Sequence, residues 1–203
     1  EVLNYYFMKI KNSKILKYLS LKPKFYFVVS LHREENVDNP ENLKKILNVL
    51  KILSDFYNYP IIVSTHPRTR KRIKELEVQK NDEKIKFLKP FGFLDYVNLQ
   101  MNATCTISDS GTISEESAIL SFPAISIRES MERPEAQDAG SIILSGFDEN
   151  TVLQSINAMI NQVKNFNKLN APVEYKIENT SWRVLNLILG NTRLSNIWNG
   201  IKN

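Results

Sequence analysis

The run FYFVVSL at residues 25–31 decides the fold class of this chain. It is short, continuously apolar and rich in β-formers, so it predicts a strand that is covered on both faces. Asn39 and Pro40 then predict the start of a helix, because asparagine is a good N-cap and proline fits the first helical turn. Apolar residues continue at helical spacing from Leu43 to Phe56. A buried strand followed by an amphipathic helix is the first half of a β-α-β unit.

The same alternation repeats along the chain. Further strands are predicted at 60–64, 85–88, 104–108, 124–127 and 141–144. Helices are predicted at about 39–56, 68–76, 94–101, 113–120, 149–163 and 181–189, with residues 196–200 expected to fray. This order indicates an α/β fold, a Rossmann-like parallel sheet with helices on both faces. Since right-handed crossovers bring the carboxyl ends of all strands to one edge, a ligand is expected at the strand-to-helix turns.

Bulk composition limits the function classes. The 203 residues, 42% hydrophobic and 24% charged, are typical of one globular domain with appendages. No apolar run approaches the roughly 20 residues that cross a bilayer, and no signal pattern opens the chain, so a cytoplasmic protein without a membrane partner is expected. The single cysteine, Cys105, argues against a disulfide or a cysteine metal site, and no metal or cofactor is expected. The net charge of +5 is modest and its lysines are dispersed, which favours a small anion over nucleic acid.

Histidines follow the first two predicted strands. His32 opens the turn HREENVDN at 32–39, where crowded charges shift each other's proton affinities. This favours a functional site over a solvated loop, with His32 as the candidate catalytic residue and Arg33 beside it. His66, in THPR at 65–68, is as consistent with a structural hydrogen bond under the loop as with binding, and Arg68 and Arg70 are candidates for contact with an anion.

The turn SDSGTISEE at 108–116 is the strongest candidate ligand site. Gly111 lets the backbone approach a phosphate closely, and Ser110 and Thr112 add hydroxyl donors. Free amides and the helix dipole at this point favour an anion, while Glu116 can accept hydrogen bonds from a ribose diol. An ordinary helix cap is the alternative. Because the turn is neither a P-loop nor Gly-x-Gly-x-x-Gly, dinucleotide and NTPase functions lose support.

Two further turns supply aromatic and basic side chains. In PFGF at 90–93 a planar base can stack on Phe91, although core packing by at least one of the two phenylalanines is the simpler interpretation. In RESMERPEA at 128–136, Arg128 and Arg133 are candidate anion ligands, and Glu132 is expected to orient Arg133. A salt-bridged loop is the alternative for this turn.

Taken together, these turns resemble the non-hydrolysing UDP-N-acetylglucosamine 2-epimerase family. The shared pieces, in the family's order across residues 21–163, are HREEN at 32–36, THP at 65–67, PFGF at 90–93, SDSGT and EE at 108–112 and 115–116, and R with ERPEA at 128 and 132–136. The set is specific, whereas each piece alone is not. Residues 88–93 and 99–103 are similar to the branch that forms UDP-N-acetyl-L-fucosamine.

The resemblance implies the C-terminal half of a glycosyltransferase-B-like two-domain fold. Residues 1–22 are then a linker or helix from the interdomain region, 23–165 a UDP-binding Rossmann-like domain, and 166–203 a tail and helix. It implies epimerisation at C2 of a UDP-N-acetylhexosamine for surface polysaccharide synthesis, by elimination and re-addition of UDP, in a homodimer at full length. His32 is implied to assist the chemistry. The candidate substrate-binding residues are Ser110, Gly111, Thr112, Glu116, Arg128, Arg133, Phe91, His66 and Arg33.

The resemblance also limits what this chain is expected to do alone. Family enzymes are about twice this length and carry their principal acid and base carboxylates in the N-terminal domain. The isolated chain is therefore expected to bind UDP weakly and to epimerise poorly. A glycosyltransferase of the same architecture and a non-catalytic UDP-binding remnant are the alternatives, and a nucleic-acid binder is the outside case.

Overall fold

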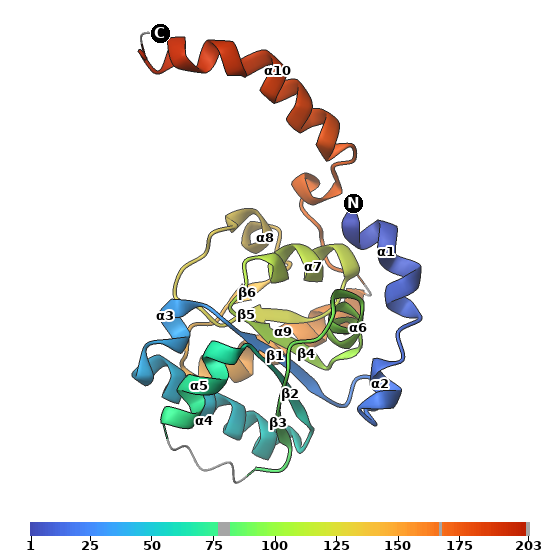
Figure 1. The fold of residues 1–203 in the computed structure, drawn as a ribbon. Helices are drawn as coiled ribbons and strands as arrows, with labels where there is room; N and C mark the ends of the chain where they lie inside the picture. Colours follow the sequence, from blue (N-terminus) through green and yellow to red (C-terminus); the bar gives the residue numbers. More distant parts are fainter. Residues whose placement is uncertain (77–81, 167, 202–203) are drawn as a thin grey trace.

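The strands form a single parallel sheet (Figure 1) in a computed structural model that describes residues 1–76, 82–166 and 168–201. The strands are β1 (Phe27–Leu31), β2 (Ile61–Thr65), β3 (Ile85–Leu88), β4 (Cys105–Ser108), β5 (Ala124–Ser126) and β6 (Ile143–Leu144). Every neighbouring pair is parallel, in the order β3-β2-β1-β4-β5-β6. The chain moves outward from β1 to β3 and then returns to β4 on the other side of β1. Ligands of open α/β sheets bind at such a reversal point.

Helices cover both faces of the sheet (Figure 1), as the sequence predicted. The helices are α1 (Val2–Lys11), α2 (Ile15–Tyr18), α3 (Glu34–Val37), α4 (Pro40–Tyr57), α5 (Pro67–Glu75), α6 (Phe93–Asn102), α7 (Thr112–Leu120), α8 (Pro134–Asp138), α9 (Glu149–Phe166), η1 (Val173–Lys176) and α10 (Thr180–Trp198). One apolar cluster lies between the sheet and α4, α5 and α9, and others lie beneath α2, α6 and α7.

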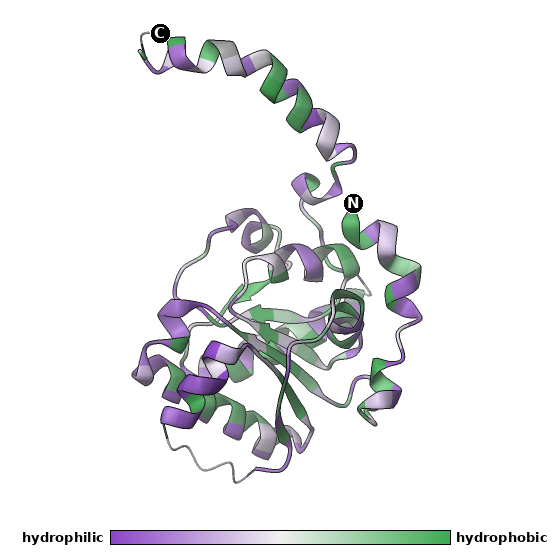
Figure 2. Ribbon diagram, in the orientation of Figure 1, coloured by the Kyte–Doolittle hydropathy of each residue, from purple (hydrophilic) through white to green (hydrophobic). Residues whose placement is uncertain are grey.

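The alternation of side chains along β1 explains why the sheet is buried on both sides. Phe27 and Val29 pack into the cluster beneath α4 and α9, whereas Val28 points to the opposite face, beneath α2 and α6. All three are fully buried. Figure 2 shows the strands as a hydrophobic centre and α5 as a largely hydrophilic helix. The continuous apolarity of this run therefore reflects two cores, one on each face.

Helix α4 begins where the sequence predicted. Asn39 is the N-cap, and its Oδ1 accepts hydrogen bonds from the N–H groups of Glu41 at 2.9 Å and Asn42 at 3.3 Å. Pro40 occupies the first turn. The helix ends at Tyr57, and its C-cap is Asn58. The φ of Asn58, 55°, lies in the left-handed region that asparagine tolerates better than most residues. Local signals thus mark both ends of this element.

The predicted strands and long helices are present with small shifts of their ends. Helix α10 is longer than the predicted 181–189 and continues to Trp198, while the fraying expected for residues 196–200 stays a prediction. The short elements α3, α8 and η1 were not predicted, since four or five residues give no periodic signal. The predicted strand at 141–144 is confined to Ile143–Leu144.

The first and last helices are covered to different degrees. Helix α1 lies along α6, where Asn98 Nδ2 donates to the carbonyl of Ile10 at 2.8 Å, and both residues are buried. Tyr5, on the same helix, is exposed. Helix α10 extends away from the sheet (Figure 1), and none of its described residues is buried. Among the described residues, no helix is both long and apolar enough to cross a membrane.

Candidate functional site

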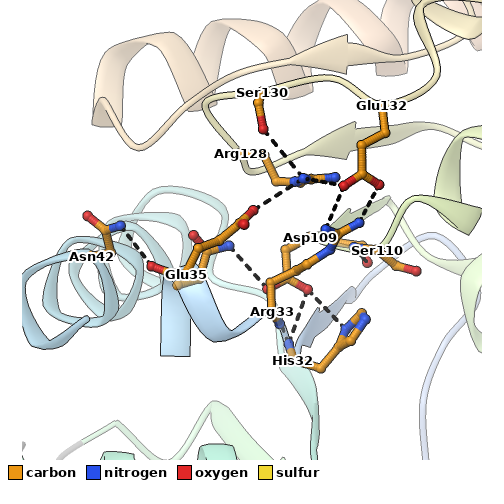
Figure 3. A network of polar contacts seen from close by, with 11 residues as sticks. His32, Arg33, Glu35, Asn42, Asp109, Ser110, Arg128, Ser130 and Glu132 are labelled. Atoms are coloured by element: carbon orange, nitrogen blue, oxygen red, sulfur yellow. Dashed lines mark hydrogen bonds and ion pairs between the residues drawn. The ribbon is translucent and has the colours of Figure 1, made fainter. Parts of the chain in front are cut away.

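The turns after β1 and β4 meet at the reversal point of the sheet. Because Ser30 and Ser108 are register partners, the residues that follow them lie side by side. Asp109, fully buried, accepts hydrogen bonds from the backbone N–H groups of His32 at 3.1 Å and Arg33 at 3.0 Å. The His32 Nδ1 lies 3.0 Å from Asp109 Oδ1 (Figure 3). One carboxylate thus joins two turns that are more than 70 residues apart in sequence.

The proton affinities of this pair are shifted in opposite directions. Burial alone would raise the pKa of Asp109, but hydrogen bonds from His32, from the Arg33 N–H and from Asn36 hold the pKa below its ordinary value. The hydrogen bond to Asp109 raises the pKa of His32, and burial together with the charges of Arg33 and Arg128 opposes this rise. Both shifts favour an ion pair between carboxylate and imidazolium.

Arginines from two turns converge beside this pair (Figure 3). Arg33 donates two hydrogen bonds to Glu132, at 2.7 and 2.5 Å, as a bidentate ion pair. Arg128, whose side chain is only 3% exposed, contacts Glu132 at 3.1 Å and Glu35 at 3.2 Å. The hydrogen bonds from Arg33 and Arg128 lower the pKa of Glu132 to about 2. Arg133 contacts a fourth carboxylate, that of Glu115.

Two expectations about these side chains need correction. Glu132 does not orient Arg133: it binds Arg33 and Arg128, while Arg133 contacts Glu115 instead. The reason is geometric, since the Glu132 carboxylate lies within hydrogen-bond distance of the guanidinium groups of Arg33 and Arg128. Arg68 contacts carboxylates of the α3 region and its carboxyl end, Glu34 and Asp38, rather than standing free for an anion.

The glycine turn opens α7 directly beneath the arginines. Gly111 is the N-cap, and its N–H group has no hydrogen-bond acceptor in the part of the chain that the structure describes. A Cβ at this position would lie 3.4 Å from Glu132 Oε2, 3.5 Å from Arg133 Nε and 3.8 Å from Arg33 Nη2. Charged groups of both signs therefore lie beside Gly111 at the start of α7.

The hydroxyl groups of the turn contact each other. The Oγ of Ser110 and the Oγ1 of Thr112 are 2.9 Å apart, and the Thr112 N–H donates to Ser110 Oγ at 3.3 Å. One of the first amides of α7 is thus already covered by a local side chain, while the other amides of the first turn have no intrahelical acceptor. The turn thus has a local side-chain hydrogen bond at the start of the helix, and anion binding at its other amides stays a prediction.

Glu116 lies one turn into α7 and faces α6. Its Oε2 accepts a hydrogen bond from Gln100 Nε2 at 2.7 Å. Burial raises its pKa, while hydrogen bonds from Gln100 and Thr112 partly oppose that rise. The other polar atom of the amide, Gln100 Oε1, is buried and has no partner among the described residues. A hydroxyl donor placed here would therefore meet acceptors on both side chains.

The remaining candidates lie at neighbouring strand ends. Phe91, after β3, is partly buried against the cluster beneath α2 and α6, which confirms the core-packing interpretation for one of the two phenylalanines. Phe93 is 44% exposed. His66, after β2, is exposed and its Nδ1 accepts the Arg68 N–H at 3.4 Å as the cap of α5. The structural interpretation of His66 therefore has a defined partner.

Sequence reasoning missed the carboxylates that organise this site. Asp109 and Glu132 were quoted within motifs, but the partners that they bind were not predicted. A signal existed for Asp109, since it directly follows a predicted strand as His32 does. The sequence analysis did not predict the order of the strands, which places β4 beside β1. Among the described residues, no group of three His, Cys, Asp or Glu side chains is arranged to hold a metal ion.

Comparisons with known proteins agree on one family. Residues 1–189 match a family model described as UDP-N-acetylglucosamine 2-epimerase. The chain is 40% identical over 144 residues to the UDP-N-acetylglucosamine 2-epimerase of Methanocaldococcus jannaschii, across 70% of this chain and 39% of the relative. It is 38% identical over 162 residues to the enzyme of the same name from Methanococcus maripaludis, across 77% and 44%.

Solved structures give the same relationship. The UDP-N-acetylglucosamine 2-epimerase of Rickettsia bellii superposes with a TM-score of 0.84 and 44% identity over 96% of this chain and 52% of the other. The Methanocaldococcus jannaschii enzyme, in complex with UDP-GlcNAc and UDP, superposes with a TM-score of 0.80 and 32% identity, over 93% and 52%. The chain spans about half the length of these relatives and matches their C-terminal half.

Proposed function

The chain belongs to the UDP-N-acetylglucosamine 2-epimerase family, and from this premise we propose that it binds the UDP moiety of a UDP-N-acetylhexosamine at the turn that opens α7. The fold supplies the C-terminal half of a glycosyltransferase-B-like architecture. The observation that carries the proposal is the free Gly111 amide at the reversal point of the sheet, with the guanidinium groups of Arg33 and Arg133 beside this glycine. Helix N-termini at this position of α/β sheets bind phosphates.

Each part of UDP has a candidate partner in this proposal. The diphosphate rests on Ser110, Gly111 and Thr112, where backbone amides and hydroxyl groups converge. Glu116, partly buried beside Gln100, accepts hydrogen bonds from the ribose hydroxyl groups. Phe91 or its backbone borders the uracil. His66, which follows the neighbouring strand β2, is a further candidate contact of the substrate. The proposal draws on the chemistry of these groups and on the complex of the Methanocaldococcus jannaschii relative with UDP-GlcNAc and UDP.

The arginines have a second task in the proposal, which is to neutralise the diphosphate. Arg33 and Arg133 are 27% and 34% exposed at their side chains, so both can exchange carboxylate partners for phosphate oxygens. Arg128 is 3% exposed and better suited to hold Glu35 and Glu132 beneath them. Exchange of one anion for another keeps these guanidinium groups paired throughout binding.

The whole enzyme is proposed to invert C2 of a UDP-N-acetylhexosamine for surface polysaccharide synthesis, as a homodimer. His32 assists elimination and re-addition of UDP from this half, and residues 1–22 and 166–203 flank the nucleotide-binding unit at 23–165. The relatives' names support UDP-N-acetylglucosamine as the sugar nucleotide. The branch that forms UDP-N-acetyl-L-fucosamine stays a prediction from residues 88–93 and 99–103. Because about half of the relatives' length is matched, the chain alone is expected to bind UDP with little turnover.

Replacing Gly111 with alanine should change UDP affinity and the stability of the fold in opposite directions. The φ of Gly111 is −65°, so alanine adopts this backbone without strain and restricts the unfolded chain, which stabilises the fold by roughly 0.4–1 kcal/mol. The added methyl group, however, fills the space through which a phosphate reaches the amide. A hydrogen bond to a charged group contributes roughly 1.5–3 kcal/mol, so G111A should weaken UDP binding about tenfold or more.

Calorimetry with UDP and urea unfolding test this directly. The matched control is Gly190→Ala in α10, where no atom lies within 4 Å of the added Cβ and UDP affinity should not change. Unchanged UDP affinity in G111A, or no UDP binding by the wild-type chain, would contradict the proposed site. An assay of UDP-sugar interconversion without an acceptor, run on the same samples, separates an epimerase from a glycosyltransferase.

A further inference from the structure

One buried carboxylate, that of Asp109, has no part in the proposed binding of UDP. It is fully buried, and its oxygens accept hydrogen bonds from the backbone N–H groups of His32 and Arg33 and from Asn36 Nδ2 at 3.1 Å. The same carboxylate lies 3.0 Å from His32 Nδ1. The backbone and the side chain of His32 are therefore held by one group, and the ring cannot turn without losing that contact.

We propose that Asp109 is a positioning residue that keeps a proton on His32 Nδ1 and leaves His32 Nε2 as the nitrogen that faces the substrate. A carboxylate only accepts hydrogen bonds, so the nitrogen beside it must carry the proton. Asp109 is completely buried, whereas the His32 side chain is 47% exposed. The open edge of the ring is therefore the one that bears Nε2. That this edge meets a UDP-sugar rests on the proposed function.

The surroundings of His32 decide how firmly the proton is held. Asp109 favours the imidazolium form, through its hydrogen bond and its charge. Arg33 and Arg128 are the cations that act against it, and partial burial of the ring does the same. A single carboxylate thus outweighs two guanidinium groups, because it is in direct contact with the ring. Without Asp109, both influences that raise the pKa of His32 would be lost.

The second histidine provides an internal reference for this proposal. His66 Nδ1 accepts the N–H of Arg68, so neutral His66 carries its proton on Nε2. The two histidines of the chain are therefore expected to be opposite tautomers: Nδ1–H in His32 and Nε2–H in His66. Which nitrogen is protonated is set by the hydrogen bond at the other, and NMR of ¹⁵N-labelled imidazole rings distinguishes the two forms.

The first experiment uses the wild-type chain without nucleotide. The imidazole ¹⁵N signals are followed through a pH titration, with the two histidines assigned by His66→Gln. We expect a protonated Nδ1 in His32 throughout the titration, a protonated Nε2 in neutral His66, and a His32 pKa above its ordinary value. A neutral His32 with its proton on Nε2 would overturn the proposal. Because no nucleotide is present, that failure leaves UDP binding at Gly111 standing, and failure of UDP binding leaves the role of Asp109 standing.

The second experiment changes the charge of the carboxylate. In Asp109→Asn we expect the pKa of His32 to move downward, because the hydrogen bond to the carboxylate and its negative charge are lost, while Arg33, Arg128 and burial still disfavour the imidazolium form. The His66 titration should stay unchanged. An unshifted His32 pKa in a folded D109N chain would overturn the proposal. Asn36→Ala is the matched variant, since it removes a different partner of Asp109 and keeps the charge, so His32 should stay Nδ1-protonated. If D109N does not fold, the tautomer of His32 measured in the wild-type chain still tests the proposal.

Discussion

His32 and the arginines beside the start of α7, Arg33, Arg128 and Arg133, each contact a carboxylate. Arg33 and Arg128 share Glu132, His32 is held by Asp109, and the pairs come from turns far apart in sequence. At the residue scale the site is therefore a balanced set of charges, in which a phosphate enters by exchange rather than by filling an unpaired positive cluster. Such a set keeps its cations oriented while it limits repulsion among them.

The charge of Glu132 gives a prediction about acid stability. Its pKa in the folded chain is about 2, below the ordinary value of 4.5, because Arg33 and Arg128 bind the charged form. A lowered pKa means that the carboxylate stabilises the fold fully above about pH 4.5 and that this contribution is lost as the pH falls toward 2. Glu132→Gln should therefore be less stable than wild type at neutral pH, and the difference should shrink across this window.

Urea midpoints of wild type and E132Q, measured from pH 7 down to the lowest pH at which both fold, check this expectation. Glu129→Gln is the control, because Glu129 lies in the same turn, is exposed and forms no ion pair in the described part of the chain. E129Q should follow wild type at every pH. A stability gap for E132Q that does not change with pH would mean that the ion pairs of Glu132 contribute nothing to folding.

At the element scale, the long helices and strands are those that sequence could predict. Helix α4 combines a cap, a first-turn proline and helical spacing over 18 residues, so its position could be predicted from local signals. Helix α3 has four residues, and Asp109 binds the N–H groups of His32 and Arg33 directly before it, a contact from a turn on the other side of the sheet reversal. The ion pair of Arg33 with Glu132 could not be predicted from the sequence either, since 99 residues separate the partners.

The cap of α4 can be tested at this scale. The Asn39 side chain satisfies two amide groups of the first turn, and loss of such a cap costs about 1 kcal/mol. Asn39→Ala should therefore lower the free energy of unfolding by about that amount in urea titration. Asn161→Ala, at an exposed position of α9, should cause no loss, because alanine is the better helix former. Equal effects of both substitutions would show that the Asn39 cap makes no contribution of its own.

At the scale of the whole molecule, the sheet domain and α10 differ in how their apolar residues are covered. The domain has apolar clusters on both faces of the sheet, whereas α10, which carries many hydrophobic residues (Figure 2), extends from it and exposes its large apolar side chains. The large side chains of α10 that are at least 40% exposed are Trp182, Val184, Leu185, Leu187, Ile188, Leu189, Leu194, Ile197 and Trp198. Contiguous apolar surface of this kind promotes association.

Removing α10 should therefore change association but not folding. A chain that ends at Thr180 keeps the contacts of Glu1 with the N–H groups of Asn179 and Thr180 and loses no described buried residue. Its urea midpoint and m-value should equal those of the full chain, because no buried surface is lost. The full chain should sediment as larger species with rising concentration, and the shortened chain should not. The double substitution Leu187→Lys and Leu189→Lys, at side chains that are 61% and 72% exposed, should suppress association in the full chain as well. A lower midpoint in the shortened chain would show instead that α10 packs against the domain and stabilises it.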